Sequence, residues 1–434
     1  MDAFADKLGR IGAWAGQNKY LGAIKNAFQN FMPLTIAGAI GVLWCNVLVN
    51  DQTGLGLFFK PIMALDFLNP AFQAVNFCTI SCITVGITLG IAQEIGVWNM
   101  GAERAGYIPG LVGLAAWLSV TNTSHMVDGA KEAFTGIAGN ELGATGLFTG
   151  MIIGVLSVEL FCFFEKQDAL KIKMPEQVPP GVARAFEVLV PATITLIITA
   201  CIGSACYNLT GLYLNDVIKN GIQGPLGAVG ATIPGVMIIY LVIMLFWLVG
   251  IHGNNMLSAV KEALFTPLAL ENVEAFNKGE TPKNIINMYA LQMWGEFGGS
   301  GVTIGLVIAI MIFGKREDNK AIATLSLVPG LFNINETVTF GIPMVLNPIL
   351  GIPFVFACLV TILVGYVLTV IGFCPVACLT VPWTTPPIVF GFLACGANVM
   401  GAVTQAILIV VSTVIYVPFL ISYEKYQNKQ AAEA

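Results

Sequence analysis

Charged residues are scarce in this chain of 434 residues. Asp, Glu, Lys and Arg make up 10% of it and histidine occurs twice, whereas soluble domains carry about 25% charged residues. Hydrophobic residues make up 56%, and uncharged runs of roughly 20 residues, enough to cross about 30 Å of hydrocarbon, recur along the chain. These runs lack the alternation of transmembrane β-strands. The sequence therefore predicts an all-α polytopic membrane protein and excludes an ordinary soluble domain.

Other absences restrict the function further. A Walker A motif is missing, which disfavours an ATP-driven pump. No basic patch indicates a nucleic-acid partner. The ten cysteines lie almost entirely within apolar segments, and none belongs to a CxxC pair. We interpret them as small buried hydrophobic residues rather than metal or redox groups, and expect neither a metal nor a cofactor.

The uncharged segments predict the membrane spans. They lie near residues 31–50, 71–92, 107–124, 142–158, 188–210, 233–251, 297–314 and 321–335, followed by a long block from 337 to 423. We expect about ten transmembrane helices, with re-entrant hairpins and broken helices in the C-terminal half. Hydropathy leaves open whether residues 253–296 cross the membrane or loop back.

Clusters of Lys and Arg predict the orientation. They precede the first span, follow the fourth, fill the segment GKREDNK and follow the last span. Because such residues favour the cytoplasmic side, both termini are expected there, in contact with lipid through an amphipathic lead-in at Met1–Gln29. The Pro-rich segment 173–184 is the predicted linker between an N-terminal half, 1–172, and a C-terminal half, 185–434.

One carboxylate stands alone in the C-terminal half. Glu336 is the only charged residue between Ala321 and Tyr423, and it lies in LFNINETVTFGIPMVLNPILGIPF. Non-helical backbone at membrane depth is tolerated where it is buried in protein or lines a watery cavity, and broken helices form the binding sites of transporters. A carboxylate beside amides such as Asn335 suits a neutral polyhydroxyl ligand. We predict that Glu336 and Asn335 line a ligand cavity.

A histidine stands in a second uncharged run, between Lys219 and Lys261. The segment WLVGIHGNNM places His252 between two glycines, followed by Asn254 and Asn255. An intramembrane ionisable residue is expensive and usually functional. From the residues alone, ligand binding and the capping of a helix end both remain open for His252.

Two more segments with polar residues belong to the candidate site. The tract CPVACLTVPWTTPPIVFG predicts a re-entrant hairpin, with Trp383 available to stack on a sugar or to lie at the membrane interface. In WGEFGGSG, Glu296 precedes three closely spaced glycines, which again predicts a broken helix. We add Trp383 and Glu296 to the candidate ligand-binding residues.

These same motifs carry a family resemblance. FNINETVTFGIPMVLNPILGIPF, with GIHGNN upstream and PWTTPP downstream, resembles the membrane component, enzyme IIC, of phosphoenolpyruvate-dependent sugar phosphotransferase systems. The similarity extends to AIKNAFQNFMPLTIAGAI and LGATGLFTGMIIGVLSVELF, and the nearest branch is that of lactose, cellobiose and diacetylchitobiose. In that family a proline usually follows the motif glutamate, whereas Thr337 stands here, which puts the rigidity of this loop in doubt.

The resemblance implies a function and a set of partners. It implies a homodimeric permease of the bacterial cytoplasmic membrane that uses the N-terminal half as dimer contact and the C-terminal half to hold a disaccharide. A separate enzyme IIB would supply the phosphocysteine, so the phosphoryl donor is expected on another chain. On this sequence the sugar would be held by His252 and Glu336, which orient the sugar C6 hydroxyl or act as base, with Asn254, Asn255 and Trp383 nearby.

Two other functions remain open. An ion-coupled secondary sugar transporter, in which Glu336 carries a proton or sodium ion, would use the same residues without any phosphorylation. A membrane receptor without flux is disfavoured by the number of broken polar segments. The sequence does not choose among diacetylchitobiose, cellobiose and lactose.

Overall fold

The structure is a computed structural model that describes residues 10, 14, 17–51, 55–125, 134–175, 177–342 and 344–433. Most of the predicted lead-in before residue 17 lies outside these residues. The chain forms two compact units. Unit 1 contains residues 39–72 and 228–434, and unit 2 contains residues 17–38 and 73–227. The sugar-holding and dimer-forming roles expected for the C-terminal and N-terminal halves stay predictions.

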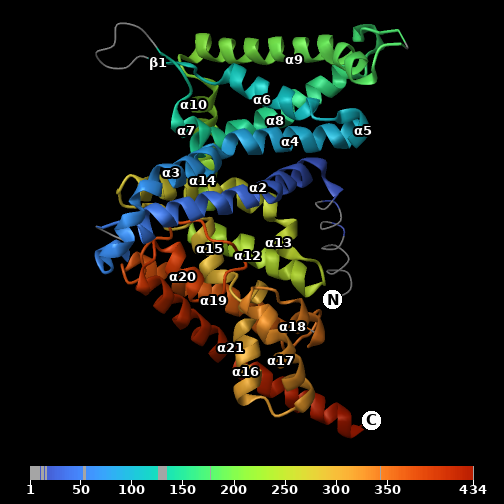
Figure 1. The fold of residues 1–434 in the computed structure, drawn as a ribbon. Helices are drawn as coiled ribbons and strands as arrows, with labels where there is room; N and C mark the ends of the chain where they lie inside the picture. The colour runs from blue at the N-terminus through green and yellow to red at the C-terminus, as the bar shows by residue number, and fades with distance from the viewer. Residues whose placement is uncertain are drawn as a thin grey trace. The chain divides into compact units, whose positions relative to one another are not determined.

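Unit 2 is a helical bundle. Its main helices are α4 (Ile83–Met100), α6 (Ile108–Val120), α8 (Ala144–Glu165) and α9 (Pro180–Thr210), and α6 and α8 each pack against both α4 and α9 (Figure 1). Small residues allow this close approach, as is usual between membrane helices. A Cβ atom added to Gly150 would lie 2.2 Å from the Thr88 hydroxyl, and one added to Gly113 would lie 2.3 Å from the Ala92 Cβ. Glycine at these two positions is therefore what sets the spacing of α4, α6 and α8.

The remaining elements of unit 2 are short. They are α5 (Ala102–Ala105), α7 (Gly139–Leu142), a 3₁₀ turn (Asp168–Leu170), α10 (Leu214–Ile218), π-helical turns at Phe77–Ser81 and Lys219–Gln223, and the antiparallel pair β1 (Ser124–His125) and β2 (Phe134–Thr135). The pair β1 and β2 was not expected from the sequence. Three helices run across a boundary between the units: α2 (Lys19–Leu43), α3 (Asn69–Asn76) and α11 (Gly224–Gly230).

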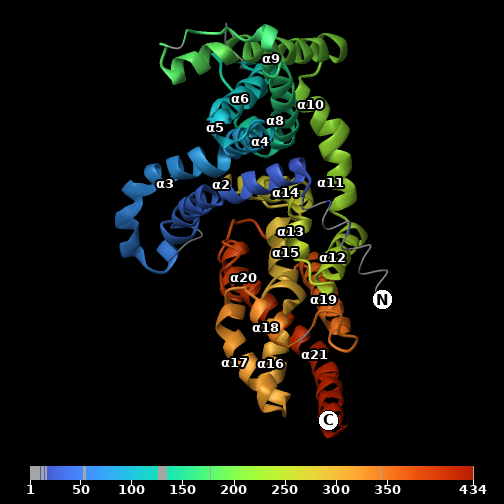
Figure 2. The same cartoon turned by 90° about the vertical axis from the view of Figure 1, so that its right-hand side faces the viewer.

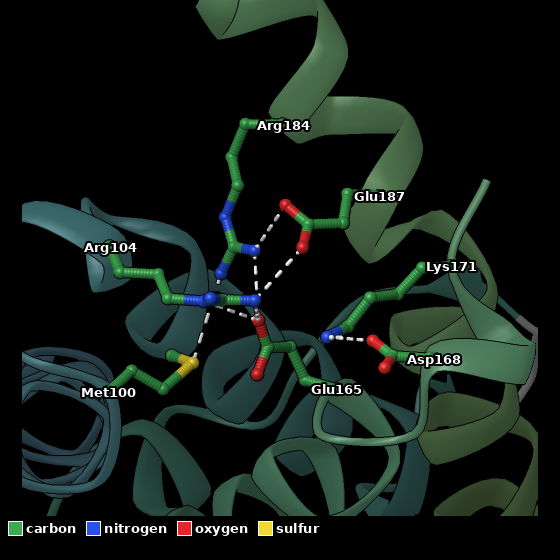
Figure 3. Close-up of polar contacts among 7 residues, drawn as sticks. All are labelled: Met100, Arg104, Glu165, Asp168, Lys171, Arg184 and Glu187. Carbon is green, nitrogen blue, oxygen red and sulfur yellow. Dashed lines mark hydrogen bonds and ion pairs between the residues drawn. The ribbon is translucent and has the colours of Figure 1, made fainter. Parts of the chain in front are cut away.

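Charged residues of unit 2 gather at the junction of α5, α8 and α9. Figure 3 shows the guanidinium groups of Arg104 and Arg184 beside the Glu165 carboxylate, and the Glu165 side chain is 3% exposed. Each arginine has a nitrogen that donates a hydrogen bond to the Glu165 Oε1 at 2.9 Å. Both arginines also reach Glu187, at 2.9 and 2.8 Å. A buried carboxylate is tolerated only when it is paired and hydrogen-bonded. The two arginines meet that condition for Glu165, so this network fixes the start of α9 to the end of α8.

Unit 1 contains more breaks. Its helices are α12 (Ile233–Leu248), α13 (Gly253–Met256), α14 (Ser258–Asn277), α15 (Met288–Gly295), α16 (Ile304–Phe313), α17 (Glu317–Leu331), α18 (Glu336–Gly341), α19 (Gly351–Val370), α20 (Val389–Ala394) and α21 (Val399–Glu433), with a π-helical turn at Trp44–Leu48 and 3₁₀ segments at Leu55–Leu57, Lys60–Leu68 and Ser300–Val302. Helix α19 packs against α12, α15 and α21, and α16 packs against α17 and α21 (Figure 2). Because many of these helices are short, unit 1 contains many helix ends.

The predicted membrane character is confirmed in part. Among the described residues, five helices are long and apolar enough to cross a bilayer, or seven if each bent helix pair is one span. Helices α6 and α12 are shorter apolar helices. The predicted broken helix is confirmed at the glycines after α15, where the axis bends by 59° on entering α16. Ten spans, and the course of residues 253–296 through the membrane, stay predictions.

The proline-rich tract between α19 and α20 is also non-helical, as expected. Its backbone folds back on the end of α20, because the Cys378 and Leu379 N–H groups both donate to the Ala394 carbonyl, at 2.8 and 3.1 Å. This tract, residues 371–388, is called the proline hairpin below.

Candidate functional site

The break between α15 and α16 is a turn that holds three glycines at positive φ. Gly298, Gly299 and Gly301 have φ angles of +67°, +84° and +76°, a region that L-residues with a side chain rarely occupy. A Cβ atom on Gly301 would also lie 2.3 Å from the Phe354 ring. We call residues Glu296–Thr303 the glycine turn. Its backbone is thereby released from helical hydrogen bonding.

Side chains satisfy the released backbone groups. The Gly298 N–H donates to the Asn333 Oδ1 at 2.6 Å, and the Asn335 Nδ2 donates to the Ser300 carbonyl at 2.8 Å. The Tyr416 hydroxyl donates to the Gly301 carbonyl at 2.8 Å. Buried backbone groups need such partners, because an unsatisfied one costs several kcal/mol in a membrane. Polar residues from α21 and from the segment before α18 thus converge on one turn.

Asn254 joins the same turn from α13. Its Nδ2 donates to the Ser300 hydroxyl at 3.1 Å. Its Oδ1 is buried and accepts no hydrogen bond from any atom that the structure describes. Asn254 and Asn335, two of the predicted ligand-binding residues, thus both donate hydrogen bonds to Ser300. Among the described residues, the Asn254 Oδ1 remains an acceptor without a donor.

Glu336 lies at the first position of α18, directly after Asn335. Its side chain is exposed, and within the described part of the chain it makes no side-chain hydrogen bond or ion pair. Carboxylates are stabilised at helix N-termini by the backbone dipoles. A ligand that binds this carboxylate would therefore displace no partner among the residues that the structure describes.

His252 caps the short helix α13. Its Nδ1 accepts from the Asn255 N–H at 3.2 Å, and its ring centroid lies 4.5 Å from that of Trp247. The side chain of Asn255 is exposed. The cap fixes the imidazole ring through Nδ1 at the start of α13. The sharing of one sugar by His252 and Glu336 stays a prediction.

Glu296 is engaged within the protein. It forms an ion pair with Lys261 of α14, and its Oε1 accepts from the Tyr240 hydroxyl of α12 at 2.7 Å. The Lys261 and Glu296 side chains are 7% and 17% exposed. Lys261 and Tyr240 were not identified as site residues from the sequence. The one feature that could have indicated Lys261 is its position among the apolar residues of α14. This arrangement anchors the start of the glycine turn to two other helices.

Trp383 lies in the proline hairpin, and its side chain is 44% exposed. Its main-chain carbonyl and that of Thr385 both accept from the Asn333 Nδ2, at 2.5 and 3.1 Å. Asn333 has a φ of +63°, which asparagine tolerates better than most residues. From the sequence, Asn333 was only one of the polar residues close to Glu336, and no contact was predicted for it. In the structure this one amide links the proline hairpin to the glycine turn.

This site has broken helices with an acid and amides at the break. Such an arrangement is typical of membrane transporters as a class. The family described as "Phosphotransferase system, EIIC" matches residues 25–358. The chain therefore belongs to the EIIC family of sugar phosphotransferase systems, whose members are membrane permeases that work with a sugar and a cytoplasmic IIB domain or subunit.

Three relatives show how far the similarity extends. The oligo-beta-mannoside-specific EIIC component of Bacillus subtilis is 33% identical, over 94% of this chain and 90% of that protein. The cellobiose-specific EIIC component of Lactococcus lactis is 29% identical, over 97% of each. The crystal structure of ChbC, the IIC component from the N,N'-diacetylchitobiose-specific phosphotransferase system, matches 98% of both chains with a TM-score of 0.88 and 29% identity. The resemblance identified from the sequence is confirmed.

Proposed function

We propose that this protein binds a β-linked disaccharide beside the glycine turn and presents its C6 hydroxyl to the phosphocysteine of a separate enzyme IIB during uptake. The names of the relatives support this sugar class, since oligo-beta-mannosides, cellobiose and diacetylchitobiose are all β-linked. Diacetylchitobiose and cellobiose are favoured, and lactose is the third candidate.

The observation that carries the proposal is the gathering of polar groups at the glycine turn. Asn254 offers a buried acceptor without a partner among the described atoms, and Glu336 offers an exposed carboxylate at a helix N-terminus. An unsatisfied buried acceptor costs about 1–3 kcal/mol, a cost that a sugar hydroxyl would offset. An acceptor-rich site without a buried unpaired charge suits a neutral sugar.

The proposed chemistry needs positioning more than covalent help. Phosphoryl transfer depends mainly on alignment and electrostatic stabilisation. The sugar C6 oxygen attacks the phosphorus, the bond from phosphorus to the cysteine sulfur breaks, and the hydroxyl proton passes to Glu336 or His252. Holding the hydroxyl in line is worth several kcal/mol. The charged product does not return easily through the apolar protein, so uptake runs in one direction.

The proposed assembly follows the family. The protein is a homodimer with about ten spans per subunit, and both termini face the cytoplasm. Single cysteines placed at Lys171 and Lys315 should then react with a membrane-impermeant maleimide from the same side. Labelling of the two positions from opposite sides would overturn this topology.

The experiment that tests the function compares products. Proteoliposomes containing the purified protein are given radiolabelled cellobiose outside and phosphorylated enzyme IIB inside. We expect sugar phosphate to accumulate only with phosphorylated IIB, and to fall strongly with Glu336→Gln. Unmodified sugar that accumulates on an imposed proton or sodium gradient would show a secondary transporter instead. Sugar binding without flux under either condition would show a receptor.

A further inference from the structure

Three sulfur atoms from three separate segments meet inside unit 1. Cys374 lies just after α19, Cys395 ends α20, and Met293 lies in α15. The Cys374 and Cys395 sulfurs are 3.9 Å apart, and the Cys395 sulfur is 3.9 Å from the Met293 sulfur. All three residues are buried, with 2%, 4% and 1% of their surface exposed. We call these residues the sulfur triad.

Two sulfur–sulfur distances in the sulfur triad, from Cys395 to Cys374 and from Cys395 to Met293, suit a metal ion bound to all three sulfurs. An ion about 2.3 Å from each of three sulfurs, at 120° to one another, places those sulfurs about 4.0 Å apart. Thiolate and thioether ligands together select soft ions such as Cu(I). No group of three or more His, Cys, Asp or Glu that could hold a metal is found in the described ranges, so the thioether of Met293 is what completes this set. Hard divalent ions lack the oxygen ligands they need here.

We propose that Cys374, Cys395 and Met293 form a binding site for a monovalent thiophilic metal ion of the Cu(I) class. Both thiols donate to one acceptor, the Pro375 carbonyl, at 3.4 and 3.3 Å, and this shared contact holds the two cysteine sulfurs side by side. Each thiol that coordinates the ion loses its proton to solvent. Burial keeps water from competing for the ion, and entry requires a local opening of the proline hairpin.

The place of the sulfur triad connects it to the candidate sugar site. Met293 lies in the helix that leads into the glycine turn, Cys374 lies within the proline hairpin that carries Trp383, and Cys395 directly follows α20. A bound ion would cross-link these elements. Metal binding is therefore expected to change the affinity for sugar, although the metal site does not rest on the proposed function.

The test measures Cu(I) binding under competition. Purified protein is reduced under anaerobic conditions and titrated with Cu(I) against bicinchoninate, which removes loosely held ions. We expect one ion to withstand competition in the unmutated protein. Cys374→Ser and Cys395→Ser should each weaken its binding by at least about 100-fold, more than the 10–100-fold typical of losing an outer partner of a metal ligand. Met293→Leu, which keeps the side-chain size, should weaken binding less than either cysteine variant.

Matched controls separate the sulfur triad from the other sulfurs. Cys162→Ser removes a buried thiol of α8, and Met288→Leu removes a buried thioether at the start of α15; both should bind the ion like the unmutated protein. Each variant is checked by its thermal unfolding midpoint, so that loss of metal binding is scored only in folded protein. Undiminished binding in folded Cys374→Ser and Cys395→Ser, or an equal loss in Cys162→Ser, would overturn the proposal. So would a disulfide between Cys374 and Cys395 in the reduced preparation, detected by mass spectrometry.

Discussion

Units 1 and 2 differ in how the polar backbone groups of their apolar segments find hydrogen-bond partners. Unit 2 relies on continuous helices such as α8 and α9, and its main charge network, around Glu165, lies where these two helices meet outside the apolar stretch (Figure 3). Unit 1 interrupts its helices and uses asparagine, serine and tyrosine side chains to bind the released backbone groups at the glycine turn.

The two units therefore differ in their capacity to bind a polar ligand at membrane depth. A continuous helix satisfies its own backbone and needs no polar side chain at membrane depth. A broken helix needs such side chains, and the same groups are then in place to bind a polar ligand. Unit 1 therefore carries the candidate site, and its glycine turn holds Gly298, Gly299 and Gly301 at positive φ.

The largest effect is expected from breaking the internal ion pair of unit 1. Lys261→Met leaves Glu296 buried without its cation, a change that typically costs about 3–5 kcal/mol. The thermal unfolding midpoint in detergent should therefore fall clearly. Lys278→Met removes the partner of Glu274 in an exposed pair, with side chains 58% and 44% exposed, where about 0–1 kcal/mol is expected.

A second variant distinguishes a lost pair from lost packing. Lys261→Met combined with Glu296→Gln should recover part of the stability, because no charge is then left unpaired. Equal midpoints for Lys261→Met and Lys278→Met would mean that the pair contributes nothing to unit 1.

The next effect compares one glycine from each unit. Gly301 and Gly211 have similar positive φ angles, +76° and +73°. A Cβ on Gly301 would lie 2.3 Å from the Phe354 ring, whereas a Cβ on Gly211 would meet nothing within 4 Å. Gly211→Ala should thus cost only the backbone strain, roughly 1–2 kcal/mol, and Gly301→Ala clearly more. Similar unfolding midpoints for the two variants would show that the glycine turn can move away from Phe354.

The sequence predicted continuous elements better than contacts. The uncharged segments near 142–158 and 188–210 marked α8 and α9, because burial in lipid demands apolar residues over a fixed length. The block from 337 to 423 contains α19 and most of α21, but the sequence did not divide it into helices. The glycines after Glu296 marked the break, because a helix rarely contains three so close together. Local pattern therefore accounts for the helices and for the place where one of them stops.

The partners at the break were not predictable in this way. Lys261 and Tyr240 lie far from Glu296 in the sequence, and a pattern along one helix does not say which other helix it faces. Glu296 was thus expected to bind ligand, whereas its charge is paired within the protein. The same holds for the cysteines: no pattern in the sequence places Cys374 near Cys395 and Met293, since only the fold of the proline hairpin brings them together.

A moderate effect is expected on ligand binding when the exposed acid is neutralised. Glu336→Gln keeps the shape but loses a charge-assisted hydrogen bond, worth about 1.5–3 kcal/mol against about 1 for a neutral one. Disaccharide affinity by calorimetry should fall by roughly 10-fold, with little change in unfolding midpoint. Glu317→Gln alters another acid at a helix start, with an 88% exposed side chain, and should bind sugar normally. Unchanged affinity in Glu336→Gln would leave Glu336 without a role in binding.

The smallest effect concerns Thr337, which stands where the family usually has proline. Thr337 is the second residue of α18, and proline fits the first turn of a helix because no N–H is needed there. Thr337→Pro should change stability by at most about 1 kcal/mol and leave sugar affinity intact. Thr324→Pro, in the middle of α17, should cost about 3 kcal/mol or more. A comparable loss in Thr337→Pro would mean that the start of α18 needs the freedom of threonine.

We propose that unit 1 holds one sugar between His252 and Glu336. The most direct measurement is calorimetric binding of the disaccharide and of its 6-deoxy analogue to four proteins: unmutated, His252→Ala, Glu336→Gln and the double variant. We predict that the unmutated protein prefers the intact sugar, that each single variant loses most of this preference, and that the two losses are not additive, as for partners of one ligand. Equal binding of the two sugars by the unmutated protein, or losses that simply add, would contradict a shared site.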